Sequence, residues 1–245
     1  MKFYLGFDNP ASAKGIIVPV MLSCRPIIRR KKPVLNPDWI MDSGGFTELS
    51  INGEYTISES EYIECIKRLK PSFAFCQDWM CEDFVLEATK KTVKEHQKLT
   101  IESYMSMSQK INVVPVLQGY WPDEYVEHCE MYRNAGVDMS QLFGVGSICA
   151  RNRTEGVYTV LRRIKEASPK IKLHAFGLKI TALRNANLVN ITESTDSQAW
   201  SFDGRRNGPT KRCRHCQHYA LAWRAKVVRV IELSKQRGIQ IESPF

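Results

Sequence analysis

The sequence predicts an α/β fold of the TIM-type (β/α)8 barrel class with a small C-terminal appendage. Three observations support this prediction. The chain has 245 residues, which fits one such barrel. Short apolar runs rich in β-branched and aromatic residues recur along the chain. Helical patterns separate several of these runs, and this alternation favours α/β architecture.

Eight apolar runs are the predicted strands. Each is nearly continuous in apolar character, which is typical of parallel strands buried on both faces. In chain order they are residues 3–6, 18–23, 39–41, 73–76, 113–117, 142–145, 173–176 and 188–191.

Four segments between the strands carry helical patterns. Residues 58–70 begin with serines suited to an N-cap and continue with apolar residues at helical spacing. Residues 81–99 repeat this pattern over a longer span. Residues 122–136 start with a proline and stop at a glycine, as helices often do, and residues 154–169 are similar.

The chain has no internal repeat and no low-complexity linker. We therefore expect one catalytic barrel domain over residues 1–203. Residues 204–245 contain a cysteine pair and a basic amphipathic segment over 220–234, and we expect this part to pack on the barrel.

The amino-acid composition indicates which class of partner this protein binds. The formal net charge is +9 and the isoelectric point about 9.1, which points to a polyanion such as nucleic acid. A merely soluble basic protein is the alternative. We see no signal-peptide pattern and no apolar run of about 20 residues, so we expect a cytoplasmic protein without a membrane partner. Apart from Cys213 and Cys216, the eight cysteines are scattered singly, mostly in apolar segments, as expected in a reducing compartment.

In barrels of this class, the catalytic groups lie where strands give way to the following loops. The residues predicted at these ends are Asp42, Asp78, Gln118, Gly119, Gly144, Gly146, Gly177 and Asp196. A site formed by these strand ends would suit a planar heterocycle. A carboxylate can accept from the N–H groups of the heterocycle, Gln118 can pair with its carbonyl, and Gly146 can offer a backbone N–H. One carboxylate could attack a sugar carbon and another could transfer a proton. Aspartate and glycine are also common in loops, and three carboxylates would also suit magnesium.

Six motifs in this order resemble those of the tRNA-guanine transglycosylases and their DNA-acting relatives. They are MDSGGF (41–46), FCQDW (75–79), VLQG (116–119), FGVG (143–146), HAFG (174–177) and STDSQAWSFDGRRNG (194–208). The resemblance covers about residues 39–224 and implies exchange of guanine for a 7-deazaguanine through a covalent aspartate–sugar intermediate.

The resemblance also implies roles for single residues. Asp42 would handle protons, Asp78 would read the edge of the base, and Gln118 would contact it. The other residues that the matching motifs place beside the base are Ser43, Gly44, Gly45, Phe46, Gly119 and Gly146.

The nucleophile requires a choice between two aspartates. The family places it eight positions ahead of the first glycine of a Gly-Arg-Asn-Gly stretch, and GRRNG here begins at Gly204, which selects Asp196 (204 − 8 = 196). Asp203 is then expected to be a loop or capping residue. An additional arginine departs from the family's pattern. We expect Arg205 and Arg206 to meet a backbone phosphate, with solvated surface arginines as the alternative.

The cysteine pair indicates a metal site that departs from the family's pattern. Cys213 and Cys216 have CxxC spacing, but Lys211 stands where the family has a further cysteine, and no histidine follows His218. We expect a structural Zn²⁺ held by Cys213, Cys216 and His218, or by His215 in place of His218, with a fourth ligand from elsewhere in the fold. A thiol pair without metal is the alternative. We expect no organic cofactor.

The sequence favours DNA over tRNA as the polymer. The tRNA enzymes are typically longer, and the DSxxW form at residues 196–200 looks more like the DNA-acting relatives of phage and bacterial modification systems. The second substrate would be a free 7-deazaguanine base of the 7-cyano-7-deazaguanine type. A noncatalytic binding subunit is a further alternative, which the two catalytic aspartates argue against. Trp79, Tyr120 and Trp121 are candidates for stacking on an extruded base, with lid or core aromatic residues as the alternative. The oligomeric state is not predicted.

Overall fold

The computed structural model describes residues 1–34, 36–149 and 154–242. The strands are β1 (Lys2–Phe7), β2 (Val20–Ser23), β3 (Trp39–Asp42), β4 (Phe73–Ala74), β5 (Val116–Leu117), β6 (Leu142–Val145), β7 (Lys172–Ala175) and β8 (Ser194–Ser197). The α-helices are α1 (Gly45–Asn52), α2 (Glu59–Leu69), α3 (Asp83–Thr89), α4 (Val93–Ser108), α5 (Pro122–Asn134), α6 (Thr154–Ala167), α7 (Ala186–Ile191), α8 (Ala199–Asn207) and α9 (Gln217–Glu242). The short 3-10 helices are η1 (Arg25–Ile27), η2 (Ala182–Arg184) and η3 (Lys211–His215).

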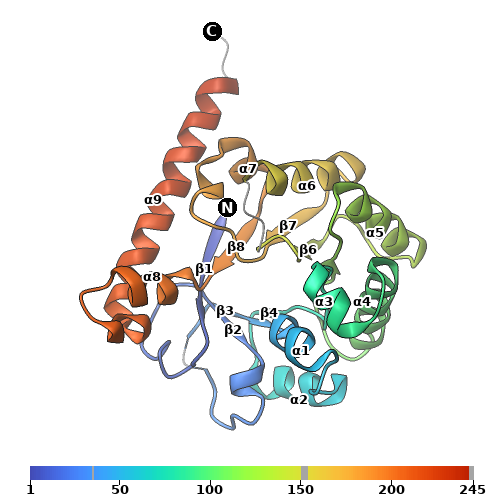
Figure 1. Ribbon diagram of the computed structural model, residues 1–245, viewed down its shortest axis with the longest axis horizontal. Helices are drawn as coiled ribbons and strands as arrows, with labels where there is room; N and C mark the ends of the chain where they lie inside the picture. The colour runs from blue at the N-terminus through green and yellow to red at the C-terminus, as the bar shows by residue number, and fades with distance from the viewer. Residues whose placement is uncertain (35, 150–153, 243–245) are drawn as a thin grey trace.

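The eight strands form one parallel sheet in the order β4-β3-β2-β1-β8-β7-β6-β5. The sheet curls, and helices surround it (Figure 1). Between the edge strands β4 and β5, the described residues form one isolated bridge, from Phe75 to Val114. The predicted α/β class is therefore confirmed, and seven of the eight predicted strands overlap strands of this parallel sheet, which is open apart from this bridge.

The prediction of a strand over residues 188–191 is wrong. These residues belong to α7, whose first turn is capped by the side chain of Asn185. The eighth strand is β8, which pairs with β1 and β7. Its residues are polar, so a search for apolar runs passes over it; Thr195 Oγ1, for example, donates to the Ala175 carbonyl at 2.6 Å.

Residues 81–99 contain parts of two helices rather than one. Lys90 adopts a left-handed backbone with φ of 55°, which ends α3. Thr92 then starts α4 by a capping box: its side chain accepts from the Glu95 N–H, and the Glu95 carboxylate accepts from the Thr92 N–H at 2.7 Å. The helices predicted over 58–70, 122–136 and 154–169 are confirmed as α2, α5 and α6.

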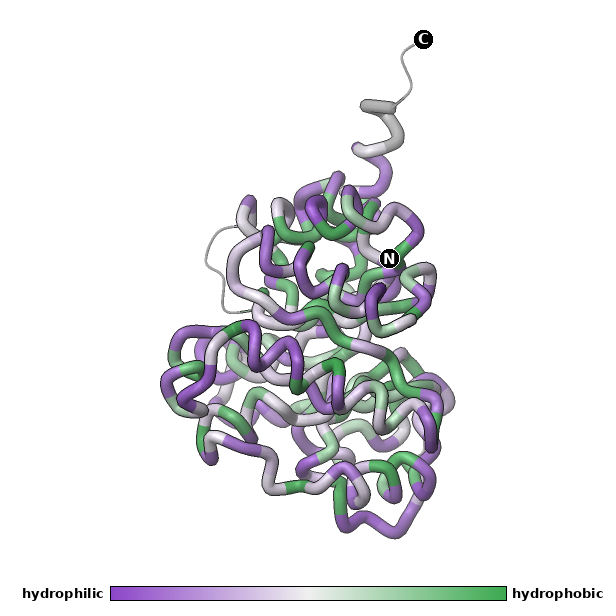
Figure 2. Tube along the Cα trace, turned by 90° about the vertical axis from the view of Figure 1, so that its right-hand side faces the viewer, coloured by the Kyte–Doolittle hydropathy of each residue, from purple (hydrophilic) through white to green (hydrophobic). Residues whose placement is uncertain are grey.

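Buried tyrosines tie the outer helices to the sheet. Tyr62 of α2 donates its hydroxyl to the Phe75 carbonyl at 2.9 Å, and Tyr132 of α5 donates to the Val116 carbonyl at 3.0 Å. Each ring adds apolar contact while its polar end is satisfied. Hydrophobic segments accordingly gather inside the molecule and hydrophilic ones outside (Figure 2). No helix in the described ranges is both long enough and apolar enough to cross a membrane.

The C-terminal helix α9 packs against α7, η2 and β1. Trp223 lies 6.1 Å from Phe3 between ring centroids, and Ser234 donates its hydroxyl to the Leu183 carbonyl at 2.8 Å. The helix predicted over 220–234 is confirmed and extends beyond both ends. The boundary expected between residues 203 and 204 falls inside α8.

Candidate active site

A cavity of about 510 Å³ opens where the carboxyl ends of the strands meet. Its lining includes three carboxylates that are far apart in the sequence, because parallel strands bring the residues at their ends to one edge. The predicted site residues in the lining are Asp42, Gly45, Phe46, Asp78, Gln118, Gly146 and Asp196. Ser43, Gly44 and Gly119 are buried beside it and are not among the lining residues.

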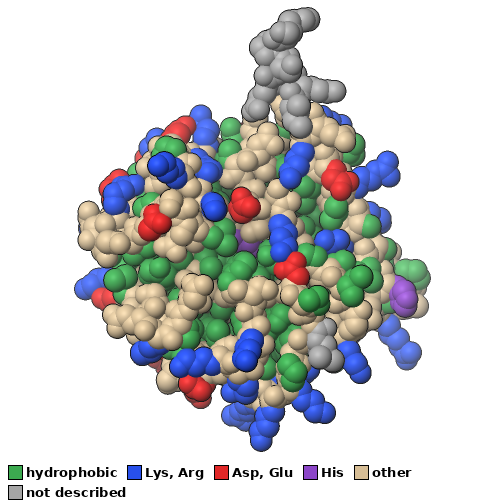
Figure 3. Space-filling view, turned by 180° about the vertical axis from the view of Figure 1, so that it is seen from behind, with side chains coloured by type: hydrophobic (Ala, Val, Ile, Leu, Met, Phe, Trp, Pro, Cys, Tyr) green, Lys and Arg blue, Asp and Glu red, His purple; other side chains and the backbone are tan. Residues whose placement is uncertain are grey.

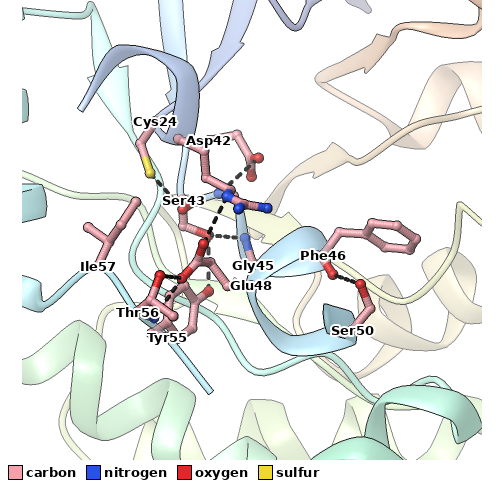
Figure 4. Close-up of polar contacts among 12 residues, drawn as sticks. Cys24, Asp42, Ser43, Gly45, Phe46, Glu48, Ser50, Tyr55, Thr56 and Ile57 are labelled. Atoms are coloured by element: carbon pink, nitrogen blue, oxygen red, sulfur yellow. Dashed lines mark hydrogen bonds and ion pairs between the residues drawn. The ribbon is translucent and has the colours of Figure 1, made fainter. Parts of the chain in front are cut away.

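The chain turns sharply after Asp42 and begins α1 at Gly45 (Figure 4). Gly44 has φ of 80°, a conformation that favours glycine, and its N–H donates to Asp42 Oδ2 at 3.0 Å. Gly45 then starts α1 close to the side chain of Tyr55. A Cβ at Gly45 would lie 2.5 Å from the Tyr55 hydroxyl oxygen, so the position requires a glycine. The DSGG sequence thus holds a carboxylate at the carboxyl end of β3 and lets the backbone that follows lie close to Tyr55.

The environment of Asp42 favours its protonated form. Burial raises the pKa of Asp42 to about 7, and the negative charges of Asp78 and Asp196 contribute to the increase. Both protonation states of Asp42 are therefore populated near neutral pH, which is the range in which a carboxyl group can act as acid and base.

Asp78 lies after β4 and is held by two side-chain donors. Ser43 Oγ donates to Asp78 Oδ1 at 3.0 Å, and Gln118 Nε2 donates to Asp78 Oδ2. Burial raises the pKa of Asp78 to about 6, and these two hydrogen bonds act in the opposite direction. A carboxylate and an amide therefore lie side by side on the cavity wall.

The orientation of the Gln118 amide is set from its other side. Ser147 Oγ lies 2.7 Å from Gln118 Oε1, so the nitrogen end of the amide faces Asp78. Gly146 leaves room for this amide, because a Cβ at that position would clash with it. The Gly146 N–H donates to the Leu117 carbonyl at 3.0 Å within the sheet. The expectation that this N–H is available to a base is therefore wrong. Gly146 instead leaves the space that the Gln118 amide occupies.

Asp196 lies within β8, and two groups approach the same oxygen of its carboxylate. The Gly177 N–H donates to Asp196 Oδ1 at 3.0 Å, and His174 Nε2 lies 3.4 Å from that atom. The described residues give no hydrogen bond to the other oxygen, Oδ2. The carboxylate is thus oriented through one oxygen only.

His174 is a site residue that sequence reasoning missed. It is fully buried, its Nδ1 lies 2.8 Å from Ser194 Oγ, and its ring packs 4.9 Å from those of Phe75 and Phe176. The HAFG motif contained the signal, since His174 precedes the end of β7 by one residue. Its register partner on β8 is Ser194, two residues before Asp196.

Asp203, the other candidate nucleophile, is not among the residues that line the cavity. Its carboxylate accepts from the Tyr219 hydroxyl at 2.5 Å and from Asn207 Nδ2 at 2.7 Å, and these bonds lower its pKa. Asp203 therefore links α8 to α9, in agreement with a structural role.

The aromatic side chains at the cavity differ from those expected. Trp79 packs against His96 and Tyr55, with ring centroids 5.4 and 6.0 Å apart, and it does not line the cavity. Tyr120 and Trp121 are also absent from the lining. The lining aromatic residues are Phe46, Phe176 and Phe202.

Within the described ranges, no three histidine, cysteine, aspartate or glutamate side chains are grouped as metal ligands. Cys213 and Cys216 are free, partly exposed thiols, and His218 is exposed. The residues present do not fit the expected zinc ion, because a structural zinc site is almost always four-coordinate. The strand-end carboxylates likewise offer no grouped magnesium site.

The fold and the cavity define a class: an α/β protein with several carboxylates at the carboxyl ends of its strands, as in enzymes that cleave glycosidic bonds. A family model described as "DpdA: DeoxyPurine in DNA protein A" matches residues 1–241. The chain belongs to this family of DNA 7-deazaguanine transglycosylases, which is related to tRNA-guanine transglycosylase. Membership implies a DNA-modifying transglycosylase and confirms the resemblance over nearly the whole chain. The comparison with curated proteins found no match.

Proposed function

We propose that this protein exchanges guanine in DNA for a 7-deazaguanine of the 7-cyano-7-deazaguanine type, through a covalent intermediate on Asp196. The observation that carries this proposal is the placement of Asp42, Asp78 and Asp196 around one cavity of about 510 Å³. The proposal treats the curled sheet as a TIM-type barrel, whose active sites lie at this end of the strands.

In the first step, Asp196 Oδ2 attacks C1′ of the target nucleotide. The C1′–N9 bond breaks, and its electron pair leaves with guanine. Asp42 in its protonated form donates a proton to a ring nitrogen of the departing base, which leaves as neutral guanine. The hydrogen bond from Gly177 to Asp196 Oδ1 supports this assignment, because it fixes the carboxylate and leaves the other oxygen for attack.

In the second step, N9 of the incoming 7-deazaguanine attacks C1′ on the face that guanine left. Asp42, now charged, takes the N9 proton, and the bond from C1′ to Asp196 breaks to regenerate the carboxylate. The two displacements together retain the configuration at C1′, and each aspartate returns to its starting protonation state.

Asp78 and Gln118 would read the edge that guanine and 7-deazaguanine share. The carboxylate of Asp78 accepts from the ring N–H and the exocyclic amino group, and Gln118 Nε2 has a second hydrogen for the base carbonyl. One pocket can therefore serve both bases, because they differ at position 7, away from this edge.

The target base must leave the DNA stack, which costs a few kcal/mol. Phe46 and Phe202 support this step, since they line the cavity while remaining 51% and 68% exposed. The reaction would take place in the cytoplasm of a bacterium or a phage-infected host.

The test is exchange of labelled guanine into DNA and tRNA in parallel. We expect incorporation into DNA and its loss in Asp196→Ala. Asp203→Ala is the matched control, because Asp203 is an aspartate of the adjoining helix that does not line the cavity. Incorporation into tRNA alone, or full activity of Asp196→Ala, would contradict the proposal; a noncatalytic subunit would incorporate label into neither polymer.

A further inference from the structure

The segment after the nucleophile carries a dense group of exposed cations. Between the start of α8 and the end of η3, five Lys and Arg side chains are exposed, and the acidic residue among them, Asp203, is already bound by Tyr219 and Asn207. The five are Arg205, Arg206, Lys211, Arg212 and Arg214.

Some other surface cations of this protein are paired, whereas these five are not paired with any described residue. Arg163 lies 2.6 Å from Asp123, and Lys2 lies 2.7 Å from Asp38. In the part of the chain that the structure describes, none of the five side chains forms an ion pair or a hydrogen bond. Their charges are therefore available to a polyanion.

Close packing holds η3 against α8. A Cβ on Gly204 would lie 2.7 Å from the Cys213 carbonyl oxygen, and a Cβ on Gly208 would lie 2.5 Å from Cys213 Cβ. Ser201 Oγ also donates to the Arg214 carbonyl at 3.0 Å. Gly208 has φ of −73°, so a glycine is needed there for space and not for its backbone conformation. This packing fixes the segment, and the described part of the chain groups no three metal ligands there.

The group of cations continues directly from the cavity. Ala199 and Phe202 of α8 line the cavity, and the helical repeat places Arg205 and Arg206 on the same face, about one turn further on. Figure 1 shows α8 at the left, and the half-turn to Figure 3 brings it to the right-hand side, where Lys and Arg side chains lie at the surface as they do elsewhere along the outline. A nucleotide bound in the cavity would bring its flanking phosphates to this rim.

We propose that α8 and η3 form a metal-independent surface that binds the sugar–phosphate backbone of the DNA strand next to the extruded nucleotide. We name it the α8–η3 surface. The choice of a DNA strand as the ligand of this surface rests on the proposed function. The contacts are charge-based and carry no sequence information, so this surface positions the strand while the cavity selects the base.

The test uses a guanine-free, single-stranded oligothymidine, which binds but cannot react. The dependence of log K on log[salt] should become shallower by about 1.4 in Arg212→Ala/Arg214→Ala, since each cation contributes about 0.7 on single strands. Lys110→Ala/Lys170→Ala is the matched control, because both lysines are exposed and precede β5 and β7 at the opposite end of the sheet. We expect the control to leave the slope unchanged.

Two further measurements separate the possible failures. Chelator treatment and metal analysis of the wild-type protein should show no stoichiometric zinc and no change in oligothymidine binding; a zinc ion whose removal weakens binding would overturn the inference. An unchanged slope in the arginine variant would also overturn it, even if guanine exchange proceeds. A reduced slope without any exchange into guanine-containing DNA would support the surface and contradict the proposed reaction.

Discussion

The strand-end cavity and the α8–η3 surface both contain residues at informative spacing, but different forces bring those residues together. In the cavity, the parallel sheet fixes the positions of Asp42, Asp78 and Asp196, because each lies at or near the carboxyl end of a strand. In the α8–η3 surface, CxxC spacing places only two thiols, and among the residues that the structure describes no strand or helix brings further ligands to them. Spacing along a chain predicts a site reliably where the fold fixes the relative positions of its parts.

Among the substitutions that distinguish the cavity from the α8–η3 surface, we expect the largest loss of exchange rate at Asp42. Asp42→Asn removes a carboxyl group that transfers protons in both steps, so the exchange rate should fall about 10²–10⁴-fold. Asp38→Asn is the matched control, since Asp38 precedes the opposite end of β3 and pairs with Lys2. Steady-state exchange of labelled guanine measures both variants. Equal rates for wild type and Asp42→Asn would remove Asp42 from the chemistry.

A smaller loss is expected at His174, which positions Asp196. His174→Phe removes a ring nitrogen that lies 3.4 Å from Asp196 Oδ1 without a hydrogen bond among the described residues, together with the 2.8 Å hydrogen bond between His174 Nδ1 and Ser194 Oγ. The loss of an ordinary hydrogen bond costs about 0.5–1.5 kcal/mol, which corresponds to roughly 2- to 10-fold in rate. We expect kcat to fall while KM for the free base stays constant, with partial rescue in His174→Gln. His218→Phe, at an exposed position, should retain wild-type rates. A change in KM alone would assign His174 to base binding.

The pH dependence of exchange tests the electrostatics of the cavity. Asp78 should be charged to bind the base, and Asp42 should be protonated to assist departure of guanine. Because the pKa of Asp78 is about 6 and that of Asp42 about 7, kcat/KM should be highest between pH 6 and 7 and fall on both sides. A profile that is flat from pH 5 to 9 would contradict these roles.

Stability should respond to pH in the opposite sense from that of a typical ion-paired carboxylate. The folded pKa of Asp42, about 7, exceeds its ordinary value of 3.8, so the unfolded chain loses its proton first. The contribution of Asp42 to stability is therefore greatest below pH 4 and declines as pH rises towards 7. Asp42→Asn should raise the melting temperature relative to wild type more at pH 8 than at pH 4, as thermal unfolding at both pH values would show. An equal shift at both would indicate no raised pKa.

The smallest effect concerns the glycine packing of the α8–η3 surface. Gly208→Ala introduces a Cβ against Cys213 and should destabilise the fold by about 1–3 kcal/mol and weaken oligothymidine binding. Gly156→Ala is the control, because Gly156 lies in α6 with no atom within 4 Å of an added Cβ, and alanine favours helix. Denaturant unfolding measures both variants. Unchanged stability of Gly208→Ala would show that this packing does not hold η3.

Much of this architecture could be predicted from the sequence, and the exceptions have physical causes. Apolar runs revealed the strands with two buried faces, but β8 escaped because its polar side chains bond within the sheet. Asp42 and Asp78 could be placed because they end or follow a predicted strand. Asp196 was placed by the motif resemblance, because the strand predicted before it is the helix α7 and Asp196 itself lies within β8. His174 was missed because its role depends on register with β8, which a single strand does not reveal. The zinc expectation rested on the spacing of two cysteines, a nearby histidine and the family's pattern, and in the part of the chain that the structure describes no three such side chains are grouped.

The central claim is that Asp196 bonds covalently to the sugar. The direct measurement incubates the protein with a guanine-containing single-stranded DNA, without an incoming base, and separates the products on a denaturing gel. We predict a protein–DNA adduct that peptide mass spectrometry locates on Asp196, that is lost in Asp196→Asn and that persists in Asp203→Asn. An adduct at another residue, or one that survives in Asp196→Asn, would contradict the claim.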